Sequence, residues 1–348
     1  MKNITINLNT TIRKAMKTLD KATEKCLLVV DDTNVLKGTL TDGDLRRSIL
    51  TGIKFTGLIT DSYNSTPTTL QAGNYTKNEA QKLLSDLKID LIPVLDKKHH
   101  VVDYITWSTL GPVRKETKPL KNVPVVIMAG GKGTRMKPFT NVLPKPLIPI
   151  REKPIIEHII ESFTSFGCSD YCLSINYKSK IMKAYFDDLK PDYNITFIEE
   201  GKPLGTAGSL YLLERSFRHP FFITNCDNII KTDYGSLYEF HKNECFDITL
   251  VASAKEYIIP YGTCILNDKG ELRDINEKPK YDFLINTGLY VINPDILQLI
   301  PQNTFFNFTD LIEKAKNSGK KIGVYPIDED DWIDVGQWKE YKQAVEVM

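Results

Sequence analysis

Residues 123–149 read VPVVIMAGGKGTRMKPFTNVLPKPLIP, and this stretch decides the fold of the larger part of the chain. It begins with an unbroken apolar run at 123–128, which is typical of a buried strand, and continues into glycines at 130, 131 and 133. Because glycine lacks a Cβ, the backbone N–H groups of such a turn can approach an anion closely. Arg135 and Lys145 add fixed positive charge. The stretch therefore predicts a phosphate-binding loop at residues 128–149.

The spacing of this stretch excludes two familiar phosphate-binding loops. A P-loop requires Gly-Lys-Ser/Thr after four variable residues, and the dinucleotide-binding fingerprint requires a third glycine where Met136 stands. A glycine-rich turn that serves only the geometry of a sheet stays an alternative. It explains the glycines but gives no reason for Arg135, Pro138 and the run Pro144-Lys145-Pro146 behind them.

The sequence after the loop alternates short apolar runs with helical patterns. The clearest helix begins at Pro154, which suits a first helical turn, and Gly167 suits its end. Its apolar residues, Ile155, Ile156, Ile159, Ile160 and Phe163, make one face. The apolar runs lie at 171–175, 195–198, 221–224 and 248–252. This alternation predicts an α/β fold with a mostly parallel sheet and helices on both faces.

The sequence before the loop contains an internal repeat with an offset of 65 residues. LVVD at 28–31 aligns with PVLD at 93–96, and TLT at 39–41 aligns with YIT at 104–106. Each copy reads as helix, strand, short polar turn, strand and helix. A polar, lysine-rich stretch at 111–122 follows the second copy, and we place the domain boundary there.

Length and composition narrow the possible functions. The 348 residues suffice for two domains with their own cores, and we expect one repeat at 1–60, another at 61–118 and a larger domain at 119–348. Lys and Arg number 45 against 44 Asp and Glu, so the charge predicts no nucleic-acid partner. The six cysteines form no CxxC pair and read as reduced thiols.

The N-terminus, MKNITIN, lacks the apolar segment of a signal peptide. No apolar run in the chain approaches the roughly 20 residues that span a bilayer. We therefore expect a cytoplasmic protein that has no membrane partner.

The loop and its surroundings resemble the signature of the sugar-1-phosphate nucleotidyltransferases. The resemblance rests on GGKGTRMKPFT at 130–140, LPKPL at 143–147 and Lys153-Pro154. It implies a Rossmann-like nucleotidyltransferase sheet and a Mg²⁺-dependent reaction, in which an oxygen of a sugar 1-phosphate attacks the α-phosphorus of an NTP and pyrophosphate leaves. Chemistry of this type depends on charge neutralisation and in-line positioning more than on acid or base groups.

The resemblance implies the nucleotide and metal ligands. Arg135 would hold the leaving pyrophosphate and Lys145 the phosphates at the reacting centre. Asp227 in TNCDN and Asp334 in WIDVG stand at the two metal-binding positions of the family and would bind Mg²⁺. Taken alone, an aspartate after a strand is more often a helix cap or a turn residue. The backbone that would hold the nucleotide belongs to Ala129, Gly130, Gly131, Gly133 and Thr134.

Two later segments, EKP at 277–279 and NTG at 286–288, resemble the sugar-phosphate segments of the family. Glu277 and Asn286, with Thr287 beside it, would bond sugar hydroxyls, and Lys278 would pair with the phosphate of the sugar. Tyr261 and Gly262 match a further sugar contact. Without the resemblance, Glu277 and Lys278 would read as a solvated loop pair, and Tyr261-Gly262 as a simple turn.

The segment EGKPLGTAG at 200–208 resembles the base-reading loop of the family, which places Glu200 and Gly205 at the nucleotide. Guanine presents N1–H and N2–H donors that one carboxylate can accept together. Uracil and thymine have a single N–H between two carbonyls and would repel a carboxylate. Glu200 therefore favours GTP. Glu199 is adjacent, so a slip of one residue would exchange their roles, and a solvated acidic pair stays an alternative.

The identity of the sugar is less readable, because epimers differ by one hydrogen bond. By similarity, glucosamine 1-phosphate is the first expectation, as in the synthesis of GDP-activated amino sugars for legionaminic-type nonulosonates. Mannose and heptose 1-phosphate come next. Uridylyl, cytidylyl or thymidylyl transfer and a non-catalytic nucleotide sensor are the other readings. The intact set of Arg135, Lys145, Asp227, Lys278 and Asp334 argues against the sensor.

The repeat resembles a tandem pair of CBS domains, an α+β architecture, through GTLTDGDL at 38–45. The resemblance implies that Thr41 and Asp44 hold the phosphate and ribose of a regulatory adenine or guanine nucleotide. It also implies a homo-oligomer, because CBS pairs commonly dimerise. Asp44 stands equally well where it could cap a helix at 45–50. The second copy has Thr106 and Thr109 at these positions, so the ribose-binding aspartate is missing.

Overall fold

A computed structural model describes residues 4–347 of the chain, except residues 23, 88, 111–119 and 214–216. The chain forms two compact units. Unit 1 contains Met1–Thr117 and Glu256–Asp282, and unit 2 contains Lys118–Lys255 and Phe283–Met348. The predicted boundary at 118/119 and most of the lysine-rich stretch around it lie outside the described residues.

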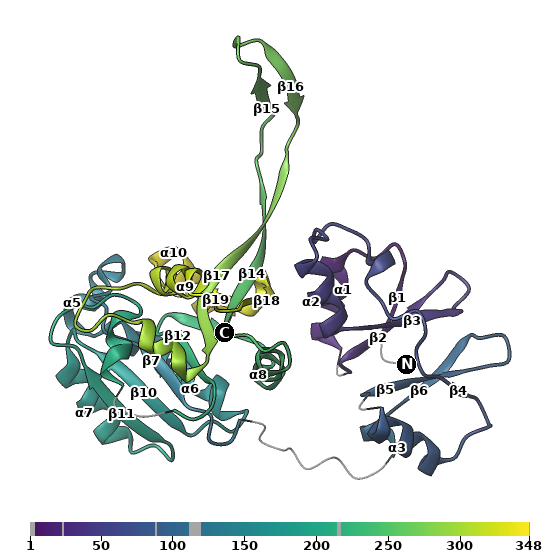
Figure 1. Ribbon diagram of the computed structural model, residues 1–348, viewed down its shortest axis with the longest axis horizontal. Helices are drawn as coiled ribbons and strands as arrows, with labels where there is room; N and C mark the ends of the chain where they lie inside the picture. Colours follow the sequence, from purple (N-terminus) through teal and green to yellow (C-terminus); the bar gives the residue numbers. More distant parts are fainter. Residues whose placement is uncertain (1–3, 23, 88, 111–119, 214–216, 348) are drawn as a thin grey trace. The chain divides into compact units, whose positions relative to one another are not determined.

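The first repeat of unit 1 is a three-stranded sheet with helices (Figure 1). β1 pairs with β2 in parallel, and β2 pairs with β3 in the antiparallel sense. The hydroxyl of Thr11 caps the first helix, whose apolar residues Ile12, Ala15, Met16 and Leu19 are buried. The elements are β1 (Thr5–Asn7), α1 (Ile12–Lys21), β2 (Cys26–Val30), β3 (Leu36–Thr41), α2 (Asp42–Leu50) and the 3-10 turn η1 (Ile59–Asp61).

The second repeat has the same elements: β4 (Leu70–Gln71), α3 (Lys77–Asp86), β5 (Leu91–Leu95), β6 (Val101–Thr106) and α4 (Trp107–Leu110). The bounds of α3, β5 and β6 equal those of α1, β2 and β3 shifted by 65 residues. A register shift recurs as well, between Val29 and Val30 in one copy and between Val94 and Leu95 in the other. The predicted repeat is therefore confirmed at the level of backbone hydrogen bonds.

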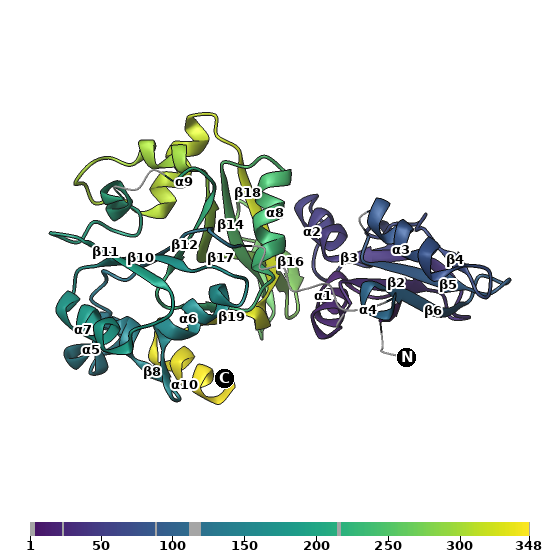
Figure 2. The same cartoon turned by 90° about the horizontal axis from the view of Figure 1, so that it is seen from below.

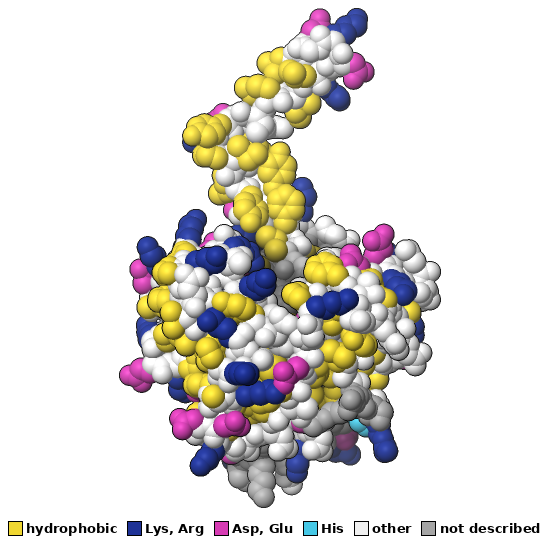
Figure 3. Space-filling model, turned by 90° about the vertical axis from the view of Figure 1, so that its left-hand side faces the viewer, with side chains coloured by type: hydrophobic (Ala, Val, Ile, Leu, Met, Phe, Trp, Pro, Cys, Tyr) yellow, Lys and Arg dark blue, Asp and Glu magenta, His cyan; other side chains and the backbone are white. Residues whose placement is uncertain are grey.

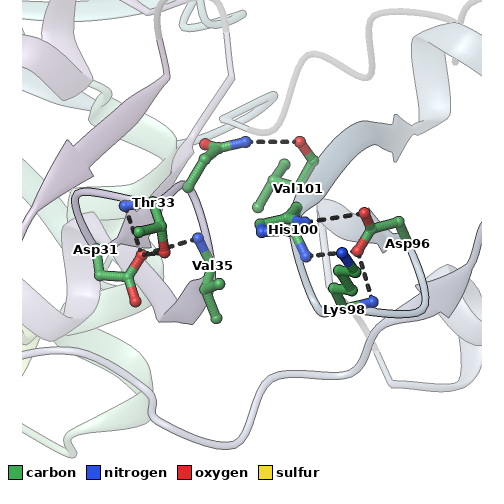
Figure 4. A network of polar contacts seen from close by, with 8 residues as sticks. Asp31, Thr33, Val35, Asp96, Lys98, His100 and Val101 are labelled. Atoms are coloured by element: carbon green, nitrogen blue, oxygen red, sulfur yellow. Dashed lines mark hydrogen bonds and ion pairs between the residues drawn. The ribbon is translucent and has the colours of Figure 1, made fainter.

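The polar turns of the two repeats fold alike and contact each other (Figure 4). Oδ1 of Asp31 accepts the N–H of Thr33 at 2.9 Å, and Oδ1 of Asp96 accepts the N–H of Lys98 at 2.8 Å. These are side-chain-to-backbone turns of the kind that Asp favours. Asn34 then donates from Nδ2 to the carbonyl of Val101 at 2.9 Å. The repeats are thus joined through the turns that the sequence predicted.

Unit 2 is built on a seven-stranded sheet with the order β11-β10-β7-β12-β17-β14-β18 (Figure 1). β10 pairs in parallel with β11 and β7, β12 pairs in parallel with β7, and β14 with β18. β17 is antiparallel to β12. The strands are β7 (Val125–Met128), β10 (Asp170–Ile175), β11 (Asn194–Glu199), β12 (Phe221–Asn225), β14 (Ile248–Ile258), β17 (Lys280–Ile292) and β18 (Ile322–Asp328).

Helices cover both faces of this sheet, as the sequence predicts. Successive residues of β7 point to opposite faces, so Val125 and Ile127 belong to one core cluster while Val126 and Met128 belong to another. The first core includes residues of α6 (Ile155–Thr164), α7 (Ser179–Leu189), α8 (Tyr234–Asn243) and α10 (Trp338–Val347). The second core includes residues of α9 (Phe308–Asn317), which lies on the other side of the sheet (Figure 2).

The helix predicted after Pro154 is α6, and its five predicted apolar residues are all buried. Pro154 is its N-cap with ψ 156° rather than a residue of its first turn. Its extended conformation ends the preceding short strand, and the helix begins one residue later. The described helices include none that is long and apolar enough to cross a bilayer.

Short elements complete unit 2 and connect the sheet to the loops around it. They are η2 (Thr134–Met136), α5 (Phe139–Val142), η3 (Lys145–Leu147), β8 (Pro149–Ile150), β9 (Lys153–Pro154), η4 (Gly208–Leu212), β13 (Asn228–Ile230), η5 (Pro294–Leu299), η6 (Glu329–Asp331) and β19 (Trp332–Asp334). β13 pairs with β19, which brings two distant parts of the sequence together.

Residues 256–282 of unit 1 form a hairpin with the antiparallel strands β15 (Thr263–Leu266) and β16 (Leu272–Asn276). Cross-strand partners point to the same side of such a pair. One face therefore carries Cys264, Leu266, Leu272 and Ile275, and the other carries Thr263, Ile265, Asp274 and Asn276. Leu266, Leu272 and Ile275 are 58–59% exposed. Figure 3 displays this accumulation of apolar side chains along the hairpin.

Candidate active site

The glycine-rich loop follows β7 and folds tightly at Gly133, whose φ of 62° is left-handed. A Cβ on Gly133 would lie 2.8 Å from Cγ2 of Thr140 and 3.0 Å from Cβ of Lys145. The carbonyl of Gly133 accepts the hydroxyl of Thr140 at 3.0 Å. Glycine at this position therefore lets the loop close against η3, the turn that begins at Lys145.

A cavity of about 440 Å³ lies at the ends of β7 and β12. Carboxyl ends of parallel strands are the usual place for ligands in open α/β sheets. Nine of the predicted site residues line this cavity: Gly130, Gly131, Gly133, Thr134, Arg135, Lys145, Glu200, Gly205 and Asp227. The remaining lining residues are Met128, Pro203, Leu204, Thr206, Asn225, Cys226, Phe305, Asn307 and Gly336.

Lys145 and Arg135 supply the positive charge of the cavity in different ways. Lys145 is buried, and its Nζ forms an ion pair with Oδ2 of Asp227. Arg135 is exposed on η2, and no ion pair in the described part of the chain uses it. The guanidinium is therefore available to an anionic ligand, whereas the ammonium of Lys145 is shared between the cavity and Asp227.

The two predicted metal ligands are brought together by the pairing of β13 with β19. In this ladder Asn228 stands opposite Asp334, and the N–H of Val335 donates to the carbonyl of Asp227 at 2.9 Å. Burial raises the pKa of the Asp334 carboxyl above its usual range, and the negative charge of Asp227 raises it further. Two carboxylates that repel each other in this way suit a divalent cation.

These two residues fit Mg²⁺ rather than a metal held entirely by the protein. No group of three or more His, Cys, Asp and Glu side chains in the described part of the chain could hold a metal ion. Mg²⁺ commonly takes one or two carboxylates and completes its shell with waters and substrate phosphates. Asp227 and Asp334 would be the residues that hold it.

The structure distinguishes the two glutamates that the sequence left interchangeable. Glu199 is exposed and forms an ion pair with Lys183 of α7. Glu200 is buried, lines the cavity, and accepts hydrogen bonds from the hydroxyl of Ser174 at 2.6 Å and the N–H of Leu204 at 3.1 Å. Of the two glutamates, only Glu200 faces the cavity.

Three predicted residues of unit 2 have their polar groups occupied within the fold. The N–H of Ala129 donates to the carbonyl of Ser174 at 2.8 Å. The hydroxyl of Thr287 donates to the carbonyl of Val251 at 2.9 Å. The amide of Asn286 donates to the hydroxyl of Tyr290 at 2.8 Å. None of the three lines the cavity described above.

The other predicted sugar contacts lie on the hairpin of unit 1. Thr263 pairs with Asn276, so Tyr261-Gly262 and Glu277-Lys278 flank the same end of the ladder. A Cβ on Gly262 would lie 2.9 Å from Oε2 of Glu277. The two segments, separate in sequence, are thus neighbours. Their role toward the sugar stays a prediction.

The sequence did not predict four residues at or behind the cavity, namely Asn225, Phe305, Asn307 and Ser174. Asn225 stands in the quoted TNCDN segment at the end of a strand, and that position could have identified it. Phe305 and Asn307 reach the cavity because the N–H groups of Ala207 and Gly208 bond the carbonyl of Phe306. Nothing in the sequence predicts this contact.

Thr41 and Asp44 of unit 1 form a capping box at the start of α2. Oδ2 of Asp44 accepts the hydroxyl of Thr41 at 2.6 Å and the N–H of Thr41 at 2.9 Å. Asp44 therefore takes part in the cap as the third residue of α2. The N-cap is Thr41 and the helix begins at Asp42, so the predicted helix start at residue 45 is wrong by three residues. In the second copy, the hydroxyl oxygen of Thr109 accepts the N–H of Thr106 at 2.9 Å, which is the counterpart of the bond from the N–H of Thr41 to Asp44.

Known proteins match the two parts of the chain separately. The nucleotidyl transferase family model matches residues 124–348, and the CBS domain model matches residues 1–51. Mannose-1-phosphate guanyltransferase 2 of Candida glabrata is 37% identical over 227 residues. The mannose-1-phosphate guanyltransferase of Saccharomyces cerevisiae is 35% identical over 232 residues. Each alignment covers 62% of this chain and 62% of the relative, so the chain spans less than two thirds of the length of these relatives.

Solved structures confirm the fold of unit 2. HddC from Yersinia pseudotuberculosis matches with a TM-score of 0.51 and 25% identity, over 64% of this chain and 98% of HddC. A Bacillus anthracis protein solved in complex with sucrose has the same fold, with a TM-score of 0.51, 19% identity and coverage of 64% and 94%. With the glycine-rich loop, the cavity and the family match over residues 124–348 in agreement, the chain belongs to the nucleotidyl transferase family and carries a CBS domain in its N-terminal part.

Proposed function

We propose that the chain transfers a nucleoside monophosphate from an NTP to a sugar 1-phosphate and releases pyrophosphate. The observation that carries this proposal is the gathering of Arg135, Lys145 and Asp227 with the glycine-rich loop around one cavity. A non-catalytic sensor needs a nucleotide site but has no need for the paired carboxylates of Asp227 and Asp334. The geometry therefore favours the enzyme over the sensor.

GTP and mannose 1-phosphate are the first substrates to be tested. Glu200 in the cavity supports guanine, and the relatives named mannose-1-phosphate guanyltransferases support the same base. Their names also favour mannose 1-phosphate over glucosamine 1-phosphate, which the sequence put first. Heptose 1-phosphate and the glucosamine route toward nonulosonates stay as alternatives, as do uridylyl, cytidylyl and thymidylyl transfer.

In the proposed reaction, each residue of the cavity has a separate role. The N–H groups of the glycine-rich loop and the Arg135 guanidinium hold the phosphates that leave as pyrophosphate, and Lys145 neutralises charge at the reacting phosphorus. Mg²⁺ bound at Asp227 and Asp334 would neutralise negative charge on the phosphates. Lys278 would pair with the phosphate of the sugar, and the proposed contacts to the sugar are Tyr261, Gly262, Glu277, Asn286 and Thr287.

Release of pyrophosphate from the four NTPs, each with mannose, glucosamine, heptose, glucose and N-acetylglucosamine 1-phosphates, tests the proposal. We expect the fastest release with GTP and mannose 1-phosphate in the presence of Mg²⁺. Turnover of another NTP would preserve the transferase and reject the guanine assignment. A complete lack of release with every pair would overturn the proposed function.

We also propose a regulatory adenine or guanine nucleotide at the CBS pair, near Thr41 and Asp44. The capping box occupies both side chains, so a bound nucleotide would have to share or replace these hydrogen bonds. Kinetics and melting of the full chain in AMP, ADP, ATP and GDP test this site. A response that disappears in Asp44→Ala would support the site, and unchanged kinetics and melting in all four would reject it.

The exposed hairpin face, Cys264, Leu266, Leu272 and Ile275, supports the proposed homo-oligomer. A contiguous exposed apolar face is typical of an interaction surface, and a second copy offers the same face, so one two-fold contact covers both. Light scattering after size exclusion should find a wild-type dimer and a monomeric Leu266→Asp/Leu272→Asp variant. Ile265→Asp, on the opposite face, is the matched control and should stay dimeric. A monomeric wild-type chain would contradict the proposal.

A further inference from the structure

Ser174 lies directly behind the carboxylate of Glu200, in a position that no motif of the sequence marks. It is the penultimate residue of β10 and is 1% exposed. Its Oγ donates to Oε1 of Glu200 at 2.6 Å and lies 2.8 Å from Oγ of Ser209, which is also buried. Two buried hydroxyl groups in contact with each other therefore lie behind one oxygen of the Glu200 carboxylate.

The chemistry of Ser174 and Glu200 determines which of them donates the hydrogen bond between them. An ionised carboxylate only accepts hydrogen bonds, so the single proton of the Ser174 hydroxyl points to Glu200. The Ser174 oxygen also lies 2.8 Å from Oγ of Ser209, so the two buried hydroxyls are in contact. The contact with Glu200 is the shorter of the two, at 2.6 Å, and a hydrogen bond to a carboxylate is stronger than one to a neutral hydroxyl.

Glu200 is held from one side and left open on the other. Leu204 donates its N–H to Oε2 at 3.1 Å, so each carboxylate oxygen has one neutral donor. No lysine or arginine in the described part of the chain forms an ion pair with Glu200. A carboxylate has about four acceptor positions, and only two are used here. Because Glu200 lines the cavity, a ligand in the cavity can reach its carboxylate.

The surroundings prevent the carboxylate from turning away. A Cβ on Gly130 would lie 2.5 Å from Oε1, so the backbone of the phosphate loop is packed against this oxygen. The main chain of Glu200 is also fixed, since its N–H donates to the carbonyl of Ile175 at 2.9 Å and its carbonyl accepts Nδ2 of Asn176 at 2.6 Å. The Ser174 hydroxyl is the side-chain contact that sets the remaining rotation of the carboxylate.

We propose that Ser174 is a positioning residue for base specificity, which holds Glu200 in the orientation where its two oxygens accept N1–H and N2–H of guanine. This inference rests on the proposed function and deepens it. Two parallel hydrogen bonds require both oxygens to lie in the plane of the base, so a small rotation breaks one of them. A purely structural Ser174 would affect folding and leave the choice of base unchanged.

A comparison of GTP with ITP isolates this role, because hypoxanthine keeps the N1–H of guanine and lacks the N2 amine. We expect wild-type kcat/KM to favour GTP over ITP by roughly tenfold or more, since a good bidentate pair discriminates on that scale. In Ser174→Ala the ratio should fall toward one through a higher KM for GTP. The kcat should stay within about twofold, because Ser174 contacts neither Lys145 nor Asp227, the residues proposed to act at the reacting phosphates.

Three further variants make the test specific. Ser174→Thr keeps the hydroxyl and should retain most of the discrimination. Ser209→Ala removes the second hydroxyl only, so its ratio should fall less than that of Ser174→Ala, and it replaces that variant if Ser174→Ala fails to fold. The control is Ser162→Ala. The hydroxyl of Ser162 donates to the carbonyl of His158 within α6, so this variant should behave as the wild-type protein.

The outcomes separate this inference from the proposed function. If GTP is turned over and Ser174→Ala keeps the wild-type ratio, the role of Ser174 is rejected and the transferase stands. If no NTP is turned over, the proposed function fails, and calorimetric binding of GTP and ITP to the two proteins decides the inference alone. A wild-type protein that binds GTP and ITP equally well would overturn it.

Discussion

Lys145 and Asp227 are 82 residues apart in sequence, and the ammonium of one pairs with the carboxylate of the other at the floor of the cavity. The lysine belongs to the turn that follows the glycine-rich loop, and the aspartate follows the strand next to β7. The pair therefore joins the turn behind the glycine-rich loop to a predicted metal ligand.

Asp227→Asn should abolish most of the Mg²⁺-dependent activity and leave the fold intact. The amide keeps the size of the carboxylate but removes the charge that would bind the metal and pair with Lys145. Loss of one electrostatic contact at a reacting centre costs roughly 100-fold or more in rate. The measurement is pyrophosphate release over a Mg²⁺ titration, with circular dichroism to follow the fold. The control is Asp295→Asn, which removes an exposed ion pair with Lys320. A near-normal rate in Asp227→Asn would show that Asp227 does not bind the metal.

Gly133→Ala and Gly131→Ala should differ in their effect on stability. Gly133 has a left-handed φ of 62°, and a Cβ there would lie only 2.8 Å from Cγ2 of Thr140, so alanine should cost about 1–3 kcal/mol. Gly131 has open space around its Cα, so alanine there should leave the melting temperature unchanged. Because Gly131 lines the cavity, its variant should instead raise KM for the NTP. Equal melting temperatures for the two variants would contradict the account of the loop.

Phe163→Ala should destabilise unit 2 by about 3–5 kcal/mol, the usual cost of removing a buried aromatic ring. The ring of Phe163 is 1% exposed and lies 4.3 Å from the ring of Tyr234 and 5.2 Å from that of Phe222, measured between centroids. Urea denaturation measures the effect. Phe305→Ala is a matched control, since Phe305 is 62% exposed and its loss should change the free energy of unfolding by less than about 0.5 kcal/mol.

His241 should make unit 2 less stable in mild acid. Burial lowers the pKa of its ring, against smaller opposing effects of Asn293 and Asp247. Below about pH 6.5 the unfolded chain binds a proton that the folded state takes up only at lower pH, so the free energy of unfolding falls as the pH falls. His241→Gln removes this proton. Denaturation at pH 7.5 and 5.5 should find a smaller drop in the variant, and an equal drop would assign the acid sensitivity to other groups.

The sequence by itself determined the elements whose signals are local. The period of apolar residues in Ile155–Thr164 and the glycine that follows predict α6, because a helix buries every third or fourth residue. The offset of 65 residues predicts the two repeats, since similar sequences adopt similar strands and turns. The glycine spacing at 130–133 predicts a loop that a ligand can approach closely, because its residues lack a Cβ, and these glycines do line the cavity. Phosphate binding by the loop stays a prediction.

Tertiary structure decided which side chains meet in the cavity. Glu199 and Glu200 are adjacent, and the sequence alone does not distinguish them. In the structure, Glu199 forms an ion pair with a lysine of α7, whereas Glu200 accepts a hydrogen bond from the buried Ser174. Ser174 contacts Glu200, Asn307 lines the cavity, and the hydroxyl of Thr287 bonds the carbonyl of Val251, in each case because of partners far along the chain. Hydrogen bonds and burial act over a few ångströms in space, and distance along the sequence does not report that proximity.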